Sequence, residues 1–541
     1  FQDVILFVVL SVLFLIGTYF LTALNNGYIG QVSNQVMYEE LHAALFEKAA
    51  DVELECFENP EFYNKYMKAV TQVKSRAHTV IWVMSSFLIS LCSLVYLIYK
   101  TASIDMFAVG FAVVPLFTTY VVGKKINGLW YELYQKNIFE ERKKEYVTRS
   151  IYQQNFAKEL RLSNGFFLLI SYFQEAIDNI VGNIRKYGIK TGLYACLSEF
   201  LNQMIMALGA IVYATVRLVY FKSITAAEYI ILINAITQIA NHIIRDGQFL
   251  SRIQDNHLYI QNIREFLEYK PKISQEQPGR KVTDDDFVLK MEHVSFSYLG
   301  SEQKALEDIN FSIRPGEKVA LVGSNGAGKS TFIKLLMRLY DPVEGRVTLN
   351  DTDVKEYSVA EYRRLFGTVF QDYHVFSLSV AENVLMRRME EGEEELVWEA
   401  LRQAGIDRKA ASFPKGIHTM LTKEFDSDGE ILSGGENQKI ALARVFAQKP
   451  AIAVLDEPSS ALDPIAEYNM YQNMLHVCQD KAMIFISHRL SSAVLADTIY
   501  MLEDGRIVER GSHEELMKRN GKYAQMFRFQ AQNYKNEEEA S

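Results

Sequence analysis

The sequence contains little cysteine, and the few residues it has are scattered. Its 541 residues hold four, Cys56, Cys92, Cys196 and Cys478, and no pair has the spacing of a zinc site or a redox motif. The set also lacks the close spacing that is typical of a disulfide framework in small secreted domains. We therefore interpret these cysteines as reduced residues with packing roles.

The sequence also has no excess of basic charge. It carries 57 Lys and Arg against 66 Asp and Glu, which gives a formal net charge of −9. A protein whose main partner is nucleic acid needs a basic surface to neutralise phosphates. The composition therefore excludes nucleic acid as the main partner.

The first apolar segment, about residues 3–24, has neither the basic start nor the cleavage site of a signal peptide, so we interpret it as a membrane helix. Similar runs follow, and the last four are paired by short turns. They lie at about residues 80–99, 105–123, 193–220 and 225–245. Buried helices of a soluble protein rarely stay apolar for this length, so this alternative is disfavoured.

The connections between these five spans differ in length and charge. Residues 26–79 and 124–192 are long, polar and helical in pattern, and the second carries Arg142, Lys143 and Lys144. Basic residues beside membrane ends favour the cytoplasmic side. We therefore expect the long connections to point inward and the short turns outward.

The C-terminal half has a different pattern. We expect a transmembrane domain with long intracellular helices at 1–264, a linker at 265–286, an α/β domain at 287–530 and a polar tail at 531–541. Short apolar runs alternate with helical stretches in the third of these, which is typical of a largely parallel sheet.

A phosphate-binding loop follows one of these apolar strands and opens a helix. The motif G-x-x-x-x-G-K-[ST] is formed by Gly323, Ser324, Asn325, Gly326, Ala327, Gly328, Lys329 and Ser330, with Thr331 next. Its backbone N–H groups and helix N-terminus suit phosphates, Lys329 suits the β- and γ-phosphates, and the Ser330 hydroxyl suits Mg²⁺. The motif predicts a site for ATP and Mg²⁺.

A second strand, residues 451–455, ends in two carboxylates. A strand end places Asp456 and Glu457 at the phosphate edge of a parallel sheet. We expect Asp456 to bind Mg²⁺, through water or directly, and Glu457 to act as general base toward the attacking water.

Between these two motifs, Leu432, Ser433, Gly434, Gly435 and Glu436 resemble the signature of ABC-transporter ATPases. The resemblance covers the whole nucleotide domain. Four further residues typical of the family stand in the expected order along the chain. By resemblance, Tyr298 stacks on adenine, Gln371 senses Mg²⁺ and couples to the membrane domain, Asp463 joins the nucleotide-binding set, and His488 contacts the γ-phosphate.

In that family two nucleotide domains sandwich two ATP molecules, each held by the phosphate loop of one subunit and the signature of the other. Ser433, Gly434 and Gly435 would then bind nucleotide across a dimer. Because both half-sites are complete, we expect a homodimer, although a heterodimer stays open. The sequence departs from the family at Glu436, where glutamine is commoner, and at 425–430, where the usual segment is only loosely matched.

A membrane domain fused ahead of the ATPase is similar to the exporter branch, which has six spans per subunit. We therefore expect the first span upstream of residue 1, where a peptidase domain also stays open. Residues 56–65 and 157–162 resemble coupling segments of bacterial peptide and lantibiotic exporters. The resemblance implies an ATP-hydrolysing exporter in a bacterial plasma membrane, with its ATPase domain in the cytoplasm, that works by alternating access and carries a peptide. A multidrug or lipid exporter and an ATP-gated regulatory membrane protein are the alternatives.

Ionisable and polar residues inside the spans are candidates for substrate contact. Glu199 could face a cavity or interfacial water, and Arg217 is expected to extend to the lipid headgroups. A polar face with helical spacing is expected to line the path, with cytoplasmic water at the inner helix end as the alternative. Its members are Asn234, Gln238, Asn241, His242 and Arg245.

Overall fold

The computed structural model describes the backbone of residues 2–153, 156–275, 278–282, 287–457, 464–487 and 490–540. The chain divides into two compact units, a helical unit of residues 1–44 and 65–268 and a mixed unit of residues 45–64 and 269–541. Residues 45–64 thus belong to the mixed unit although helices of the other unit flank them in the sequence.

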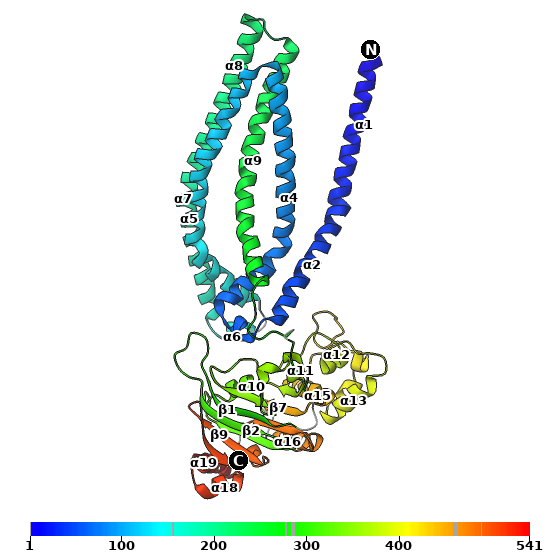
Figure 1. Cartoon of the computed structure of the whole chain (residues 1–541), viewed down its shortest axis with the longest axis vertical. Helices are drawn as coiled ribbons and strands as arrows, with labels where there is room; N and C mark the ends of the chain where they lie inside the picture. The colour runs from blue at the N-terminus through cyan, green and yellow to red at the C-terminus, as the bar shows by residue number, and fades with distance from the viewer. Residues whose placement is uncertain are drawn as a thin grey trace. The chain divides into compact units, whose positions relative to one another are not determined.

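Long helices build the helical unit (Figure 1), and several continue directly into π-helical or 3₁₀ turns. In chain order they are α1 Gln2–Leu24, η1 Asn25–Ile29, α2 Gly30–Asp51, α4 Pro60–Ile104, η2 Met106–Ala112, α5 Val113–Tyr152, α6 Ala157–Leu162, α7 Gly165–Gln203, η4 Met204–Gly209, α8 Ala210–Thr215, η5 Val216–Tyr220 and α9 Ala226–Leu267. The short α3, Leu54–Glu58, lies in the segment that belongs to the mixed unit.

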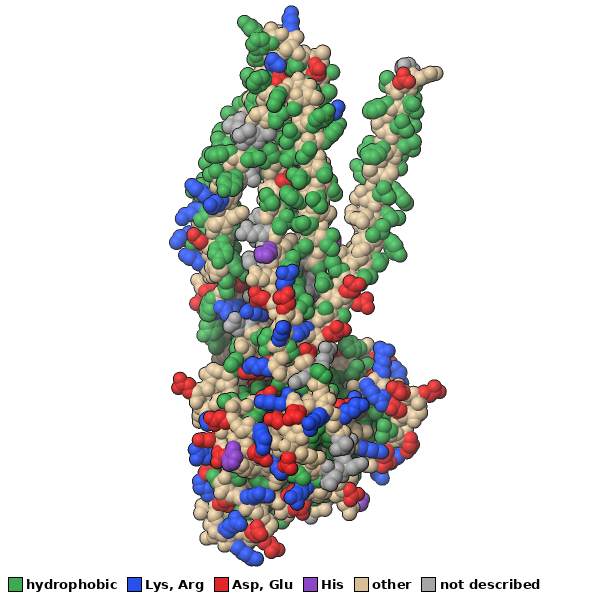
Figure 2. Space-filling model, in the orientation of Figure 1, with side chains coloured by type: hydrophobic (Ala, Val, Ile, Leu, Met, Phe, Trp, Pro, Cys, Tyr) green, Lys and Arg blue, Asp and Glu red, His purple; other side chains and the backbone are tan. Residues whose placement is uncertain are grey.

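Apolar side chains cover much of the helical unit's visible face (Figure 2). None of the residues of α1 is buried, and large apolar side chains such as Phe7 and Phe14 are more than two thirds exposed. Within the described residues, three helices are long and apolar enough to cross a membrane, namely Gln2–Asp51, Ala77–Ile104 and Met106–Tyr152. Exposed apolar surface of this extent is suited to lipid or to a second chain rather than to water.

The remaining two expected spans lie in helices that are less uniformly apolar. Ala210–Tyr220, at the end of the expected fourth span, is a shorter apolar stretch. The expected fifth span lies in α9, which is 42 residues long and begins with a capping box formed by Thr225 and Glu228. Polar residues on one face of α9 lower its average hydropathy, although the helix has ample length to span a bilayer.

Two sheets organise the mixed unit. The first has the order β2-β1-β4-β5 and is antiparallel, and the second has the order β10-β9-β3-β8-β7-β6. In the second sheet β9, β3, β8, β7 and β6 are parallel, and β10 is antiparallel at the edge. The strands are β1 Leu289–Phe296, β2 Leu306–Ile313, β3 Lys318–Gly323, β4 Glu344–Leu349, β5 Thr352–Asp353, β6 Phe366–Val369, β7 Ile452–Asp456, β8 Ala482–Ile486, β9 Thr498–Glu503 and β10 Arg506–Gly511.

The parallel strands are apolar throughout because both faces of the sheet are covered. Every residue of β3, β7 and β8 is buried, and two hydrophobic clusters lie on the two sides of this sheet. The other helices of the mixed unit are α10 Lys329–Leu336, η6 Val354–Glu356, α11 Val359–Arg364, α12 Val380–Leu385, α13 Glu394–Gln403, α14 Asp407–Ala411, η7 Gly416–His418, α15 Gly434–Gln448, α16 Pro464–Val477, α17 Leu490–Ala493, α18 His513–Arg519 and α19 Lys522–Ala540. This is the predicted α/β architecture with a largely parallel sheet.

Candidate nucleotide site and its connections

The phosphate loop joins the end of β3 to the start of α10, as its motif predicts. Gly326 and Gly328 have φ of +80° and +101°, in the left-handed region that side chains with a Cβ rarely adopt. A Cβ on Gly328 would also lie 2.8 Å from the carbonyl oxygen of Ala305. The loop therefore needs glycine at this position both for its conformation and for the close approach of β2.

Lys329, the first residue of α10, is buried within this loop. Its Nζ donates hydrogen bonds of 2.9 Å to the carbonyl oxygens of Gly323 and Ser324. Burial lowers the pKa of Lys329, and the charges of Glu457 and Asp456 oppose this effect. The ammonium is thus held at the loop by acceptors that a phosphate could replace.

Asp456 and Glu457 lie at the end of β7, on the same edge of the sheet as the phosphate loop. Asp456 is buried, and burial together with Glu457 raises its pKa to about 6, while the Ser330 hydroxyl and Lys329 act in the opposite direction. Glu457 has φ of +50°, a strained value for a residue with a side chain. The structure thus brings together Lys329, Ser330, Asp456 and Glu457, which are far apart in the sequence.

The donor set at this edge fits a magnesium ion. Asp456 interacts with the Ser330 hydroxyl, and its Oδ1 is buried with no hydrogen-bond partner in the described part of the chain. A carboxylate and a hydroxyl beside a phosphate site are the oxygen ligands that Mg²⁺ prefers. An orphaned buried carboxylate oxygen costs free energy unless a cation or water satisfies it.

Tyr298 precedes the phosphate loop in the sequence, whereas the two carboxylates follow it. In the structure Tyr298 contacts α10. Its hydroxyl is 2.9 Å from the Thr331 hydroxyl. Its ring meets Phe296 and Tyr340 edge to face, with centroid distances of 5.0 and 5.6 Å. Tyr298 is therefore a half-buried aromatic residue attached to the phosphate-loop helix, as a base-stacking residue must be.

The signature residues form the start of α15. Ser433 is the N-cap, and its backbone N–H donates to Glu436 Oε2 at 2.8 Å, which closes a capping box. This hydrogen bond is the largest cause of the lowered pKa of Glu436. The departure from glutamine at Glu436 therefore has a structural role, because a carboxylate at this position caps the helix.

Ser433 and Gly434 are exposed at this helix start, where backbone N–H groups and the helix dipole suit an anion. Gln371 follows β6, and the neighbouring Asp372 is close enough to Asp456 to raise its pKa. Tyr373 lies in the same loop, two residues after Gln371, and its hydroxyl donates to the carbonyl oxygen of Gly434 at 2.9 Å. The loop that carries Gln371 is thus tied to the signature helix, a link that the sequence does not reveal.

Two of the predicted nucleotide residues lie outside the described residues. Asp463 follows β7 after the last described residue of that strand end, and His488 follows β8. Their proposed roles rest on the sequence alone.

Residues around α3 make further contacts that sequence reasoning missed. The Tyr269 hydroxyl donates to Glu53 at 2.5 Å, and the Ser274 hydroxyl donates to Asp51 at 2.6 Å. Leu54 packs against the hydrophobic cluster that also contains β1 to β3. The segment that resembles a coupling segment, residues 56–65, thus begins in a helix that docks on the mixed unit. No local pattern marks these contacts, because their partners are more than 200 residues apart.

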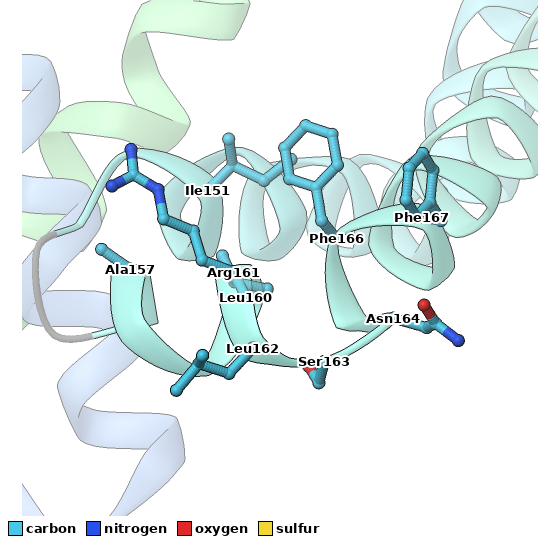
Figure 3. A pocket seen from close by; sticks show the side chains of 9 residues that line it. All are labelled: Ile151, Ala157, Leu160, Arg161, Leu162, Ser163, Asn164, Phe166 and Phe167. Carbon is cyan, nitrogen blue, oxygen red and sulfur yellow. The ribbon is translucent and has the colours of Figure 1, made fainter.

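The other segment with this resemblance, α6, lies in the helical unit beside the ends of α5 and α7. It borders a hollow whose lining includes Ile151, Leu160, Leu162 and Phe166 (Figure 3). Leu162 is 90% exposed, which is unusual for a large apolar side chain at the end of a short helix.

Polar residues of the membrane helices occupy different environments. Glu199 is exposed on α7. Arg217 differs from the expectation that it extends to headgroups, because its Nε lies 2.8 Å from the nearly buried carboxylate of Asp105. A buried carboxylate at the short turn after α4 gives the guanidinium an ion-pair partner within the bundle.

The polar face of α9 is only partly engaged. The His242 ring is 2.8 Å from the Ser90 hydroxyl of α4, and Arg245 contacts both. The side chains of Asn234, Gln238, Asn241 and Arg245 are exposed, and they follow one another along α9 at spacings of three and four residues.

Comparison with known proteins decides the family. The profile of the family described as "ABC transporter" matches residues 306–460. The subtilin transport ATP-binding protein SpaT of Bacillus subtilis is 30% identical over 523 residues, which cover 95% of this chain and 83% of that protein. The chain belongs to the ABC transporter family.

Other relatives match part of the chain or share its fold. ATP-binding cassette sub-family B member 6 of Mus musculus is 35% identical over 58% of this chain and 37% of that protein. A bacterial Atm1-family ABC exporter, solved with ATP bound, has the same fold, with a TM-score of 0.74, 22% identity, and coverage of 97% of this chain and 91% of that one. This ABC transporter chain therefore has the exporter arrangement, with membrane helices ahead of an ATPase domain that couples ATP hydrolysis to transport.

Proposed function

We propose that this ABC exporter chain works as a homodimer in a bacterial plasma membrane, binds ATP with Mg²⁺ and exports a peptide by alternating access. The carrying observation is that Lys329, Ser330, Asp456 and Glu457 meet at one sheet edge while the signature start of α15 is exposed. A second copy would supply the exposed Ser433 and Gly434, with the partly buried Gly435, to each nucleotide. The ATPase domain lies in the cytoplasm in this proposal.

In this proposal the residues divide the work of binding and hydrolysis between them. The phosphate-loop backbone and Lys329 bind the phosphates, Tyr298 and Asp463 complete the nucleotide set, and the strained backbone at Glu457 directs its carboxylate toward the attacking water as general base. His488 contacts the γ-phosphate, and Gln371 senses Mg²⁺ and couples the site to the membrane domain. Ser330, Gln371 and Asp456 would hold Mg²⁺, which supplies charge neutralisation at the phosphates.

Peptide is the proposed substrate class because of two convergent hints. Residues 56–65 and α6 resemble segments of peptide and lantibiotic exporters, and the relative with the broadest coverage reported above is named for subtilin transport. The exposed Leu162 gives α6 an apolar side chain that a docking helix could bury. Drug or lipid export is the second candidate.

The polar face of α9 supports a translocation path. Exposed amides on a membrane helix are costly against lipid, so Asn234, Gln238 and Asn241 are better placed facing water or a second subunit. Asp105 and Arg217 lie near the short turns that follow α4 and η5. Their ion pair is therefore not part of this face of α9.

The test is ATP hydrolysis by the purified chain in lipid, with a panel of peptides, lipids and drugs. Glu457→Gln should lower kcat by about 10²- to 10⁴-fold, the usual contribution of a general base, while ATP still binds. Lys329→Met is the matched control, because it should weaken ATP binding itself. Stimulation of the unsubstituted protein by peptides alone supports the peptide proposal, and stimulation only by drugs or lipids contradicts it. Absence of hydrolysis would contradict the exporter proposal in favour of a regulatory role.

A further inference from the structure

Glu58, the last residue of α3, is joined to two residues of the ATPase domain. Lys334 of α10 places its Nζ 3.0 Å from Glu58 Oε1. The hydroxyl of Tyr340, just after α10, donates to Glu58 Oε2. Burial and the nearby Glu58 raise the pKa of Tyr340, so its hydroxyl keeps the proton that it donates. Both carboxylate oxygens of Glu58 are therefore engaged.

The same two residues enclose the ring of Tyr298. The Tyr340 ring stands edge to face against it at an interplanar angle of 84°, and the Lys334 ammonium lies 5.8 Å from the centroids of both rings. Phe296 closes another side of Tyr298, and Thr331 holds its hydroxyl. A ring packed on this many sides cannot shift without moving Tyr340 or Lys334.

We propose that α3 responds to the base of the bound nucleotide. The base stacks on Tyr298, and its effect passes to α3 through a cluster of four residues, Tyr298, Tyr340, Lys334 and Glu58, so that an aromatic base on Tyr298 fixes the position of α3. The proposal rests on the proposed function, in which the base of ATP stacks on Tyr298. Tyr340 and Lys334 are positioning residues here, because they act on the base only through Tyr298. The ligand that this route senses is the base of a nucleoside di- or triphosphate.

This route is separate from the one that runs through Gln371. Gln371 follows β6 and precedes Asp372, which is close enough to Asp456 to raise its pKa, so in the proposed function it responds to the γ-phosphate and the metal. The cluster around Tyr298 meets the phosphate-loop helix through Thr331, but Glu58, Tyr340 and Lys334 are joined to Tyr298 and to one another, so in this proposal α3 responds to the base. A consequence is that α3 stays fixed after hydrolysis for as long as the diphosphate remains bound.

Hydrogen exchange of the α3 amides tests this route in the full chain in lipid, with Glu457→Gln present to keep the triphosphate intact. Exchange is measured with ATP and with ribose 5′-triphosphate, which has no base, each at about 100 times its measured Kd, where the site is nearly filled. We expect ATP to slow α3 exchange about fivefold more than the base-free compound, the lower end of typical coupling between sites.

Substitutions decide whether the cluster carries the effect. Tyr340→Phe keeps the ring but removes the hydroxyl, and Glu58→Ala removes both contacts, so each should bring the ATP-to-ribose-triphosphate ratio close to one. Glu55→Ala is the matched control on the same helix, because Glu55 pairs with Lys272 at 3.1 Å and is not in the cluster around Tyr298. It should keep the ratio.

Two results would overturn the inference while leaving the proposed function intact. One is equal protection of α3 by the two triphosphates in the chain with an intact cluster. The other is an unchanged ratio in Tyr340→Phe, a variant whose folding is checked by its thermal unfolding. Failure of ATP to bind at all, seen in the Kd measurement, would overturn the proposed function and this inference together.

Discussion

The glycines of the phosphate loop differ in what a side chain would meet. At Gly326 φ is +80° but no atom lies within 4 Å of an added Cβ, whereas at Gly328 a Cβ would meet Leu306 at 2.7 Å and the Ala305 carbonyl oxygen at 2.8 Å. Gly326→Ala should therefore cost about 1–2 kcal/mol from the backbone alone, and Gly328→Ala more, because β2 must also move. Thermal unfolding without nucleotide measures both. A smaller loss for Gly328→Ala would contradict the close packing of β2.

The meeting of Lys329, Ser330, Asp456 and Glu457 at one sheet edge could be predicted from the sequence, whereas their roles stay predictions. The spacing of the phosphate loop and the strand that ends in Asp456 and Glu457 carry their own structural context, since a parallel strand delivers its last residues to the ligand edge. Tyr340 and Glu58 could not be found this way. They are 282 residues apart, and a tyrosine and a glutamate without a motif have no sequence signal for their pairing.

At the scale of single helices, α15 offers a test of the unusual Glu436. Glu436→Gln should keep the capping box with Ser433 and leave turnover within about twofold, whereas Glu436→Ala should cost about 1 kcal/mol of helix stability and lower turnover. Steady-state ATP hydrolysis and thermal unfolding in lipid measure the two effects. Equal behaviour of the two variants would mean that the cap has no influence on the signature.

The pH dependence of this cap follows from the lowered pKa of Glu436, caused first by the Ser433 backbone N–H and opposed by burial. A carboxyl group with a lower pKa in the folded state stabilises the fold above its unfolded pKa, and this contribution is lost as the pH falls through the folded value. The unsubstituted protein should therefore lose its stability advantage over Glu436→Gln on acidification below about pH 4.5. An advantage that persists in acid would contradict a charged cap.

The sequence predicts helices and strands reliably where their apolar pattern is strong, and less reliably elsewhere. The apolar strands β3, β7 and β8 and the long apolar helices follow from periodicity and length. The π-helical turns η4 and η5 within the fourth expected span were not predicted, because an extra residue per turn leaves no mark in composition. The pairing of Arg217 with Asp105 was missed for a related reason, since it depends on how two helix ends meet.

At the scale of the whole molecule, the sequence gives two halves in order along the chain, and the structure groups residues 45–64 with the C-terminal half. The reason is physical. Leu54 and Cys56 are apolar, and the acidic side chains of this segment find partners in the C-terminal half. Glu53 and Glu55 bind Tyr269 and Lys272 of the expected linker, and Glu58 binds Lys334 and Tyr340 of the ATPase domain. Such docking requires contacts over long sequence separations, which a scan for local patterns cannot supply.

Transport requires the membrane helices and the ATPase domain to act together. Substitutions on the polar face of α9 test this coupling. Gln238→Leu with Asn241→Leu removes two exposed amides from a membrane helix without touching the nucleotide residues. Substrate-stimulated hydrolysis should fall to the basal rate, because stimulation needs substrate to bind, while basal hydrolysis should stay within about twofold. Thr22→Val on α1 is the control, since its hydroxyl donates only within its own helix to Thr18 at 2.7 Å. If stimulation survives the double substitution, this face does not bind the substrate; if basal hydrolysis falls too, α9 acts on the fold or on coupling instead.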